Sequence, residues 1–219
     1  MAVGVNDMDQ AVKDETALHP YQIRRNAMRQ LMMIHLLDTI PDVPAVPGYS
    51  IRAFRPGDEE AWVEICRCGL CAEDATISAW NDAILGRAEL KPESDVFFAC
   101  RDADGTPAAT TTGYVRSDGV GDIHMVACRY DDRGHGLGAA LLSHAMKKLK
   151  AELPEEGRRV ELTTDDFRLP AIVGYLRGGF HPVLYDEGME ERWRKITETL
   201  NMHGYEMLNE EGKPTGIVL

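Results

Sequence analysis

A glycine-rich loop is the part of the sequence whose residue types and spacing could do the most chemistry. The run Arg133-Gly-His-Gly-Leu-Gly138 stands between an expected strand and an expected helix. Free N–H groups at a helix start bind anions, and glycines without Cβ atoms let a diphosphate contact the backbone. Arg133 can add a side-chain bond to a phosphate oxygen. The loop predicts a phosphate-bearing ligand; the alternative is a tight turn that only begins a helix.

Two common phosphate-binding loops fit this run poorly. No Lys-Ser or Lys-Thr pair follows the glycines, although a P-loop needs one to bind the terminal phosphates and Mg²⁺. A Rossmann loop follows the first strand of a parallel unit, whereas this loop follows an expected antiparallel meander. Nucleoside triphosphates and dinucleotides are therefore disfavoured as ligands.

Strands and helices that alternate along the chain must position this loop. We expect strands at residues 49–54, 95–101, 107–115, 122–129, 160–164 and 180–185. We expect helices around Trp62 and at residues 76–85, 137–153, 170–177 and 187–202. Turn residues between positions 95 and 129 join three strands into an antiparallel meander. The predicted fold class is mixed α/β (α+β).

The first 48 residues differ from the rest and are predicted to be an N-terminal extension. Apolar residues at helical spacing predict one helix over residues 21–40, and the prolines of residues 41–48 predict an extended linker. The helical positions are Ile23, Ala27, Leu31, Ile34 and Leu37. The main domain is expected at residues 49–186, and a C-terminal helix and tail at 187–219. The N-terminal helix is expected to pack on the domain or on a second subunit of a homodimer, or to dock a partner.

Composition narrows the classes of partner. The chain has 24 Lys and Arg against 36 Asp and Glu, a net charge of -12. This charge repels polyanions, so we expect neither nucleic acid nor an anionic membrane as a partner. No secretion signal and no membrane-length apolar run is evident. With five cysteines in such a chain, we expect reduced thiols and a cytoplasmic location.

Three cysteines, Cys66, Cys68 and Cys71, have a spacing that invites a zinc interpretation. On a helix, the first two side chains point about 200° apart. No second cysteine pair or nearby histidine completes four ligands. We expect these cysteines to belong to the core and expect no metal.

Beyond the physics of the loop, the sequence resembles the GNAT superfamily of acyl-CoA-dependent N-acyltransferases. The signature of that superfamily is Gln or Arg, two residues, Gly, one residue, then Gly or Ala, and Arg133, Gly136 and Gly138 fill its three places. The later run from Ala171 through Tyr175 to Phe180 also matches the superfamily pattern. The resemblance covers residues 49–186.

The resemblance implies that backbone amides of the loop hold the diphosphate of acetyl-CoA. The implied cofactor-binding residues are Cys128, Arg133, Gly134, His135, Gly136, Leu137, Gly138 and Ala139. The pantetheine arm would lie along the end of strand 122–129, and the thioester would sit where strands 122–129 and 160–164 splay apart. The sequence departs from the superfamily pattern at two places. The run Cys128-Arg129-Tyr130 lacks the proline that often precedes the loop, and Arg168 stands where an asparagine is common. Both departures concern the pantetheine and acceptor contacts.

Amine acylation needs a proton donor for the departing thiolate and a donor for the oxyanion. By resemblance, Tyr175 points at the thioester sulfur, and its phenol stays protonated at neutral pH. The alternative is a helix tyrosine packed beside Phe180. For the oxyanion, we expect a backbone N–H near Ala127 or Cys128. A cysteine nucleophile at Cys128 is disfavoured, because no paired histidine is evident.

The amine must also lose a proton, and Asp122 and His124 are the candidate bases. With Val126 and Cys128, they are expected on one face of a strand of period two. The alternative for each is a strand residue that is simply hydrogen-bonded. Acceptor specificity is expected from the early helices, near Trp62, and from residues after 185.

The sequence therefore predicts an N-acetyltransferase that moves the acetyl group of acetyl-CoA to a primary amine of a small molecule or peptide. Transfer is expected to be direct, in a ternary complex. The negative charge favours a cationic amine. The alternative function is a non-catalytic acyl-CoA-binding or regulatory module.

Overall fold

A seven-stranded mixed sheet, in the order β2-β3-β4-β5-β6-β1-β7, is the centre of the fold. The computed structural model describes residues 29–219, and the chain from Leu31 to Leu219 forms one unit. The strands of this sheet are β1 Leu31–His35, β2 Tyr49–Ala53, β3 Val96–Arg101, β4 Pro107–Val115, β5 Gly121–Cys128, β6 Val160–Thr164 and β7 His181–Pro182. A separate hairpin contains β8 Glu206–Leu208 and β9 Pro214–Val218. The mixed α/β prediction and the antiparallel meander β3-β4-β5 are confirmed.

Helices lie between these strands, and each except the short α4 overlaps a range that the sequence predicts as helical. They are α2 Glu59–Arg67, α3 Ile77–Trp80, the π-helical turn η1 Asn81–Leu85, α4 Pro92–Asp95, α5 Leu137–Glu152, α6 Leu169–Arg177 and α7 Met189–Leu200. A short 3₁₀ turn, η2 Tyr130–Asp132, precedes the glycine loop. Among the described residues, no helix has the length and apolar character needed to cross a membrane.

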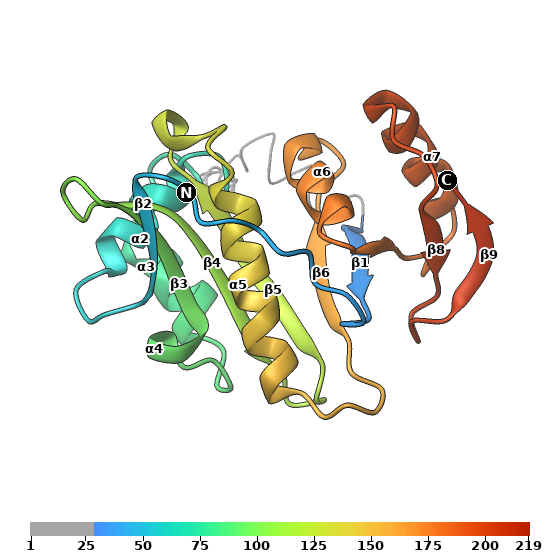
Figure 1. Ribbon diagram of the computed structural model, residues 1–219, viewed down its shortest axis with the longest axis horizontal. Helices are drawn as coiled ribbons and strands as arrows, with labels where there is room; N and C mark the ends of the chain where they lie inside the picture. The colour runs from blue at the N-terminus through green and yellow to red at the C-terminus, as the bar shows by residue number, and fades with distance from the viewer. Residues whose placement is uncertain (1–28) are drawn as a thin grey trace, which may run out of the picture. The chain divides into compact units, whose positions relative to one another are not determined.

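The sheet separates two apolar cores, as the alternation along β3 shows. Phe97 and Ala99 pack in the core under α5, α6 and α7, whereas Val96 and Phe98 pack in the core under α2 and α3. Successive strand residues point to opposite faces, so these helices cover opposite sides of the sheet (Figure 1). Trp62 is fully buried in the second core, so its own side chain packs there, and acceptor specificity from the early helices around it stays a prediction.

Strand β1 corrects one prediction. The helix predicted over residues 21–40 is wrong from residue 29 onward, where residues 31–35 form a strand, and its earlier part lies outside the described residues. β1 pairs antiparallel with both β6 and β7, so it belongs to the sheet of the main domain. Leu31, Met33 and Ile34 are fully buried. A strand buried on both faces shows an unbroken apolar run, which periodicity cannot distinguish from a helix.

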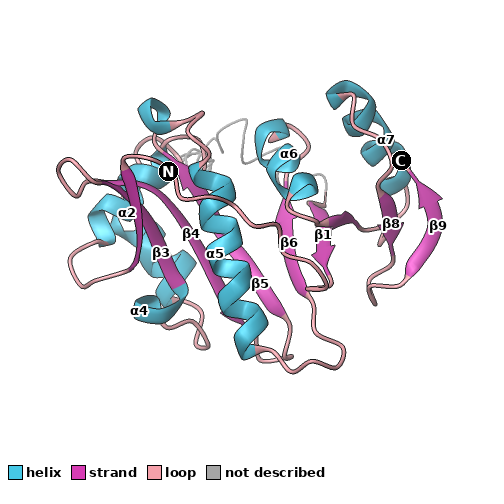
Figure 2. Cartoon of the chain, in the orientation of Figure 1, coloured by secondary structure: helices cyan, strands magenta, loops and turns pink. Residues whose placement is uncertain are grey.

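A segment that we call the strap, residues 36–48, connects β1 to β2 across α5 (Figure 2). Ser143 donates a hydrogen bond of 3.1 Å to the Pro41 carbonyl. Lys147 pairs with Asp42 at 3.1 Å. Residues 41–48 of the strap are the predicted extended linker, and these contacts fasten them to the helix that follows the glycine loop.

The C-terminal part agrees with the sequence in its helix and differs in its strands. The helix predicted over residues 187–202 is α7, Met189–Leu200. The strand predicted over residues 180–185 is confined to His181–Pro182, because the backbone of Leu184 turns to bond Leu208 of the hairpin at 2.8 Å. The tail contributes the hairpin β8-β9, which pattern analysis did not resolve.

Candidate functional site

The glycine loop presents an open backbone at the start of α5. Gly134 and Gly136 have φ angles of +84° and +87°, which glycine adopts without strain and other residues disfavour. Gly136 is the N-cap of α5. A Cβ built on Gly134, Gly136 or Gly138 would meet nothing within 4 Å. The loop therefore has free space against its backbone, as contact with a diphosphate requires.

Arg133 makes backbone contacts that the sequence did not anticipate. Its guanidinium donates to the carbonyls of Cys128, at 3.4 Å, and Cys68. It also lies 4.3 Å from the ring centroid of Tyr130. Arg133 thus ties the end of β5 to the loop after α2, and a phosphate contact would require these bonds to exchange.

The parallel strands β5 and β6 separate almost as soon as they begin. Their only paired positions in the described structure are Gly121 with Val160 and Asp122 with Glu161. After Asp122, β6 continues to pair with β1 and β5 continues to pair with β4. The edges of β5 and β6 that face each other therefore make no further pairs (Figure 1). Since the Arg129 N–H donates to the Ala108 carbonyl of the β4 side, alternation turns the N–H of Cys128 toward the opening. This N–H is a candidate oxyanion donor, as the sequence predicted.

A bulge in β5 overturns one prediction about this strand. Met125 has a φ of +54°, and the β4–β5 register shifts between Thr110 and Thr112. The extra residue reverses which side of the sheet each later residue faces. The prediction that Asp122, His124, Val126 and Cys128 share one face is therefore wrong.

The bulge leaves the candidate groups on opposite faces of the sheet. Val126 and Cys128 pack against the core that contains Tyr175. His124 bonds the backbone of Ala83 in η1, on the α2 and α3 side. The predicted acid is thus on one face of the opening, and the predicted bases are on the other.

Tyr175 is buried on α6 and packs against Phe180, with ring centroids 6.0 Å apart. Burial raises its pKa from 10.0 to about 12. The phenol therefore stays protonated throughout the neutral range, which suits a proton donor. Its packing against Phe180 is also what the structural alternative expects, so the structure is consistent with both roles.

The two candidate bases differ in exposure and basicity. Burial raises the pKa of Asp122, and its side chain remains 21% exposed beside Arg116 at 3.4 Å. Burial lowers the pKa of His124 from 6.5 to about 4, and its Nε2 atom is buried without a partner. At neutral pH, His124 is therefore uncharged, and Asp122 is the more accessible of the two side chains.

The prediction that Cys66, Cys68 and Cys71 belong to the core holds for Cys66, whereas Cys71 is only half-buried against that core and Cys68 is half-buried outside it. Cys66 is fully buried in the core beside α2, and burial raises its pKa. Burial also raises the pKa of Cys128 from 9.0 to about 11, so its thiolate is scarce at neutral pH and a role as nucleophile is disfavoured. Within residues 29–219, no group of three or more His, Cys, Asp or Glu side chains is arranged to hold a metal ion.

Sequence reasoning missed a buried ion pair directly before the glycine loop. Asp132 is 1% exposed. It accepts bonds of 2.8 and 2.7 Å from Arg101 and of 2.8 Å from the Tyr49 hydroxyl. These partners are far away in the sequence, so no local pattern indicates them.

Sequence reasoning also missed the contacts of Arg168, although it noted the residue. Arg168 pairs with Asp165 at 3.0 Å and donates to the Gly69 carbonyl at 2.8 Å. Arg133 bonds the neighbouring Cys68 carbonyl. Two arginines, one from each side of the β5–β6 opening, thus hold the turn after α2.

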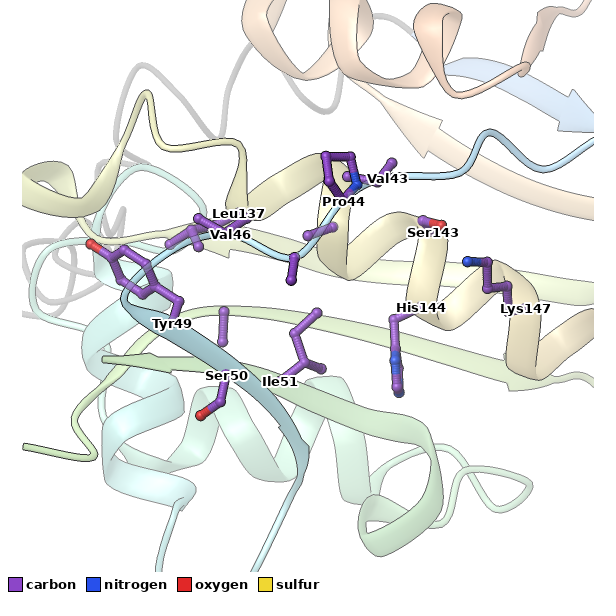
Figure 3. A pocket seen from close by; sticks show the side chains of 13 residues that line it. Val43, Pro44, Val46, Tyr49, Ser50, Ile51, Leu137, Ser143, His144 and Lys147 are labelled. Carbon is purple, nitrogen blue, oxygen red and sulfur yellow. The ribbon is translucent and has the colours of Figure 1, made fainter. Parts of the chain in front are cut away.

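A cavity of about 410 Å³ lies between the strap, β2 and α5. Val46 and Leu137 line one end with Tyr49, and His144 and Lys147 lie at the other (Figure 3). The cavity is on the α5 side, away from Asp122 and His124. It shares Tyr49 and Leu137 with the surroundings of the glycine loop.

Two features together define a member of the acetyltransferase class: the parallel strands β5 and β6 separate, and an open glycine loop follows β5. The model of the Acetyltransferase (GNAT) family matches residues 59–180. This match covers more than half of the chain, and the protein belongs to that family.

Individual relatives agree with the family assignment. Mycothiol acetyltransferase of Actinosynnema mirum is 29% identical over 145 residues, which cover 64% of this chain and 48% of that protein. The protein of the same name from Salinispora arenicola is 27% identical over 150 residues, or 64% and 47% of the two chains. A crystal structure of a GCN5-related N-acetyltransferase from Sphaerobacter thermophilus has a TM-score of 0.58 and 26% identity, covering 74% of this chain and 52% of that chain. The chain spans about half the length of the curated relatives that it matches.

Proposed function

We propose that the protein is an N-acetyltransferase that transfers the acetyl group of acetyl-CoA directly to a primary amine in a ternary complex. One observation carries the proposal: β5 and β6 part directly after their last pair, Asp122 with Glu161, and along the parted β5 Cys128 faces the core of Tyr175, whereas Asp122 faces the other side of the sheet. An amine and a thioester that approach from opposite faces can react through this opening. The open glycine loop supports a diphosphate-bearing donor beside it.

In the proposed reaction, the neutral amine nitrogen attacks the thioester carbonyl carbon and the C=O electrons move onto oxygen. The backbone N–H of Cys128 donates to this oxyanion. Collapse re-forms the C=O bond and breaks the C–S bond, and the thiolate takes the proton of Tyr175. The proton lost by the amine passes through water to the carboxylate of Asp122, and proton exchange with solvent then restores both the carboxylate and the phenol.

Asp122 is the base we favour over His124. A carboxyl whose pKa is raised by burial accepts a proton more readily than an ordinary aspartate, and part of its side chain reaches solvent. The neutral His124 imidazole, with Nε2 enclosed, instead holds η1 against β5 through its bond to Ala83.

The acceptor proposed is a small molecule or peptide that carries a cationic amine. The net charge of -12 concentrates cations near the protein. The relatives' name, mycothiol acetyltransferase, also denotes acetylation of a small molecule. We further propose that the protein acts in the cytoplasm and needs no metal.

The test combines binding and turnover. Calorimetry with CoA and a thiol-release assay with acetyl-CoA are run against polyamines, amino sugars and lysine peptides. Mass spectrometry for copurifying CoA adds an independent observation. Thiol release that requires an amine supports the enzyme. Tight CoA binding without turnover across the panel would favour the regulatory-module alternative.

A further inference from the structure

The glycine loop is anchored by a cluster that we call the brace: the buried Asp132 and its half-buried partners Tyr49 and Arg101. Tyr49 and Arg101 are direct cross-strand partners of β2 and β3, so their side chains leave the sheet on one face. Both reach Asp132, the last residue of η2. Asp132 is two residues before Gly134, the first glycine of the loop.

The brace also contacts the one side chain between the first two glycines. The Tyr49 ring lies 5.6 Å from the His135 ring. His135 Nδ1 is 3.2 Å from the Asp132 carbonyl oxygen. Figure 3 shows Tyr49 beside Leu137, the first residue of α5. Residues at the sheet edge thus contact the loop region at three points: Asp132 before the loop, His135 within it and Leu137 where α5 begins.

Glycine loops lose much conformational freedom when a ligand orders them. A loop that is already fixed by the rest of the protein binds its ligand with a smaller entropic loss. Gly134 and Gly136 provide no side chains that could fix the loop by themselves, so the order must come from neighbours. In the described structure, Asp132 supplies the most buried of these contacts.

Charge alone argues against an aspartate at this place. A carboxylate close to a diphosphate repels it, so its removal should strengthen binding if Coulomb forces dominate. Arg101 neutralises Asp132 through two bonds and keeps the pKa of the carboxyl below its usual value. A geometric role and an electrostatic role therefore predict opposite signs for the same substitution.

We propose that Asp132, held by Arg101 and Tyr49, is a positioning residue that keeps the glycine loop in the conformation that binds the diphosphate of acetyl-CoA. This inference rests on the proposed function for the donor. The inference gives Tyr49, Arg101 and Asp132, which lie outside the family signature, a specific role in binding the diphosphate of the substrate.

The experiment compares two acyl donors, acetyl-CoA and acetyl-pantetheine, because the second lacks the diphosphate. In Asp132→Asn, we expect kcat/KM for acetyl-CoA to fall by about tenfold, mainly through KM, and kcat/KM for acetyl-pantetheine to stay within about twofold. Tyr49→Phe removes one hydrogen bond and keeps the ring, so it tests the same effect in a variant that folds, with an expected loss of about threefold.

Asp95→Asn is the matched control. Asp95 is also buried and pairs with Lys148 at 2.5 Å, on α4 and the far part of α5, away from the loop. The Asp95→Asn variant loses a comparable ion pair. Its ratio of kcat/KM for acetyl-CoA to kcat/KM for acetyl-pantetheine should therefore equal that of the unaltered protein. Thermal unfolding of all variants reports any shared loss of stability.

Three outcomes would overturn the proposal. Equal losses with both donors would make the brace a general structural element. Unchanged or tighter CoA binding in Asp132→Asn and Tyr49→Phe would show that the loop does not depend on it. An unaltered chain that does not bind CoA in calorimetry would overturn the proposed function as well, which separates that failure from failure of the brace alone.

Discussion

The open space beside Gly136 yields the sharpest prediction. Gly136→Ala adds one methyl group at a φ of +87° where nothing lies within 4 Å. The left-handed backbone costs an alanine about 1 kcal/mol, and the stiffer unfolded chain offsets part of this cost. The unliganded protein should therefore lose at most about 1 kcal/mol of stability.

Binding of CoA should suffer more than stability does. The methyl occupies the space through which a diphosphate reaches the backbone N–H groups. Loss of one hydrogen bond to a charged group is worth about 1.5 to 3 kcal/mol, so the Kd for CoA should rise by about tenfold to a hundredfold. Gly136→Asp adds a carboxylate and should weaken CoA further.

Gly157→Ala provides the control for the backbone effect. Gly157 has a φ of +67° and also no atom within 4 Å of its built Cβ, but it lies in the loop between α5 and β6. Calorimetry and thermal unfolding should show similar stability changes in the two alanine variants and a change in CoA affinity only at Gly136. A Kd within twofold of the parent in folded Gly136→Ala would remove this loop from the binding site.

Other parts of the site give further predictions. Tyr175→Phe should keep CoA affinity and lower turnover by about 10- to 1,000-fold; parental turnover, with chemistry shown to be rate-limiting, would make Tyr175 a packing residue. Asp122 acts only when ionised, so its raised pKa should place the acid limb of kcat/KM above the usual aspartate range. Asp122→Asn should lower the rate and abolish that limb, and an unchanged profile would exclude it as base. His124 binds a proton more weakly when folded, with a pKa lowered from 6.5 to about 4, so the free energy of unfolding should fall by up to about 3 kcal/mol as pH drops through that interval. Urea unfolding of His124→Gln should show a smaller fall; an equal fall would contradict the assignment. Met33→Asp, at a fully buried position of β1, should destabilise the fold by several kcal/mol, whereas Leu36→Asp, 36% exposed, should not; equal melting temperatures would argue against β1 in the sheet.

The sequence predicts well where local spacing decides the structure. The meander, α5 and β6 lie within a few residues of their expected bounds, because turn residues and apolar spacing act over short distances. The glycine loop was likewise readable, since the glycines that permit its positive φ angles lie inside the run. The family match confirms the resemblance to the GNAT superfamily.

The errors occur where a distant partner decides the structure. Leu31, Ile34 and Leu37 fit a helical spacing, yet β6 would have an almost unpaired edge without the segment that contains the first two. The gain from pairing and burial outweighs a weak local preference. The brace illustrates the same limit, because Tyr49 meets Asp132 across 83 positions of the chain.

The bulge at Met125 shows how one residue changes the chemistry that a strand can support. A regular β5 would place Asp122, His124 and Cys128 on one face, with base and thioester on the same side of the sheet. The extra residue instead directs Cys128 toward the core of Tyr175 and leaves Asp122 on the opposite face. In the proposed reaction the amine attacks one face of the planar thioester, and the bulged strand leaves the proposed proton donor, Tyr175, on one side of the sheet and the proposed base, Asp122, on the other, so each can serve a different reactant.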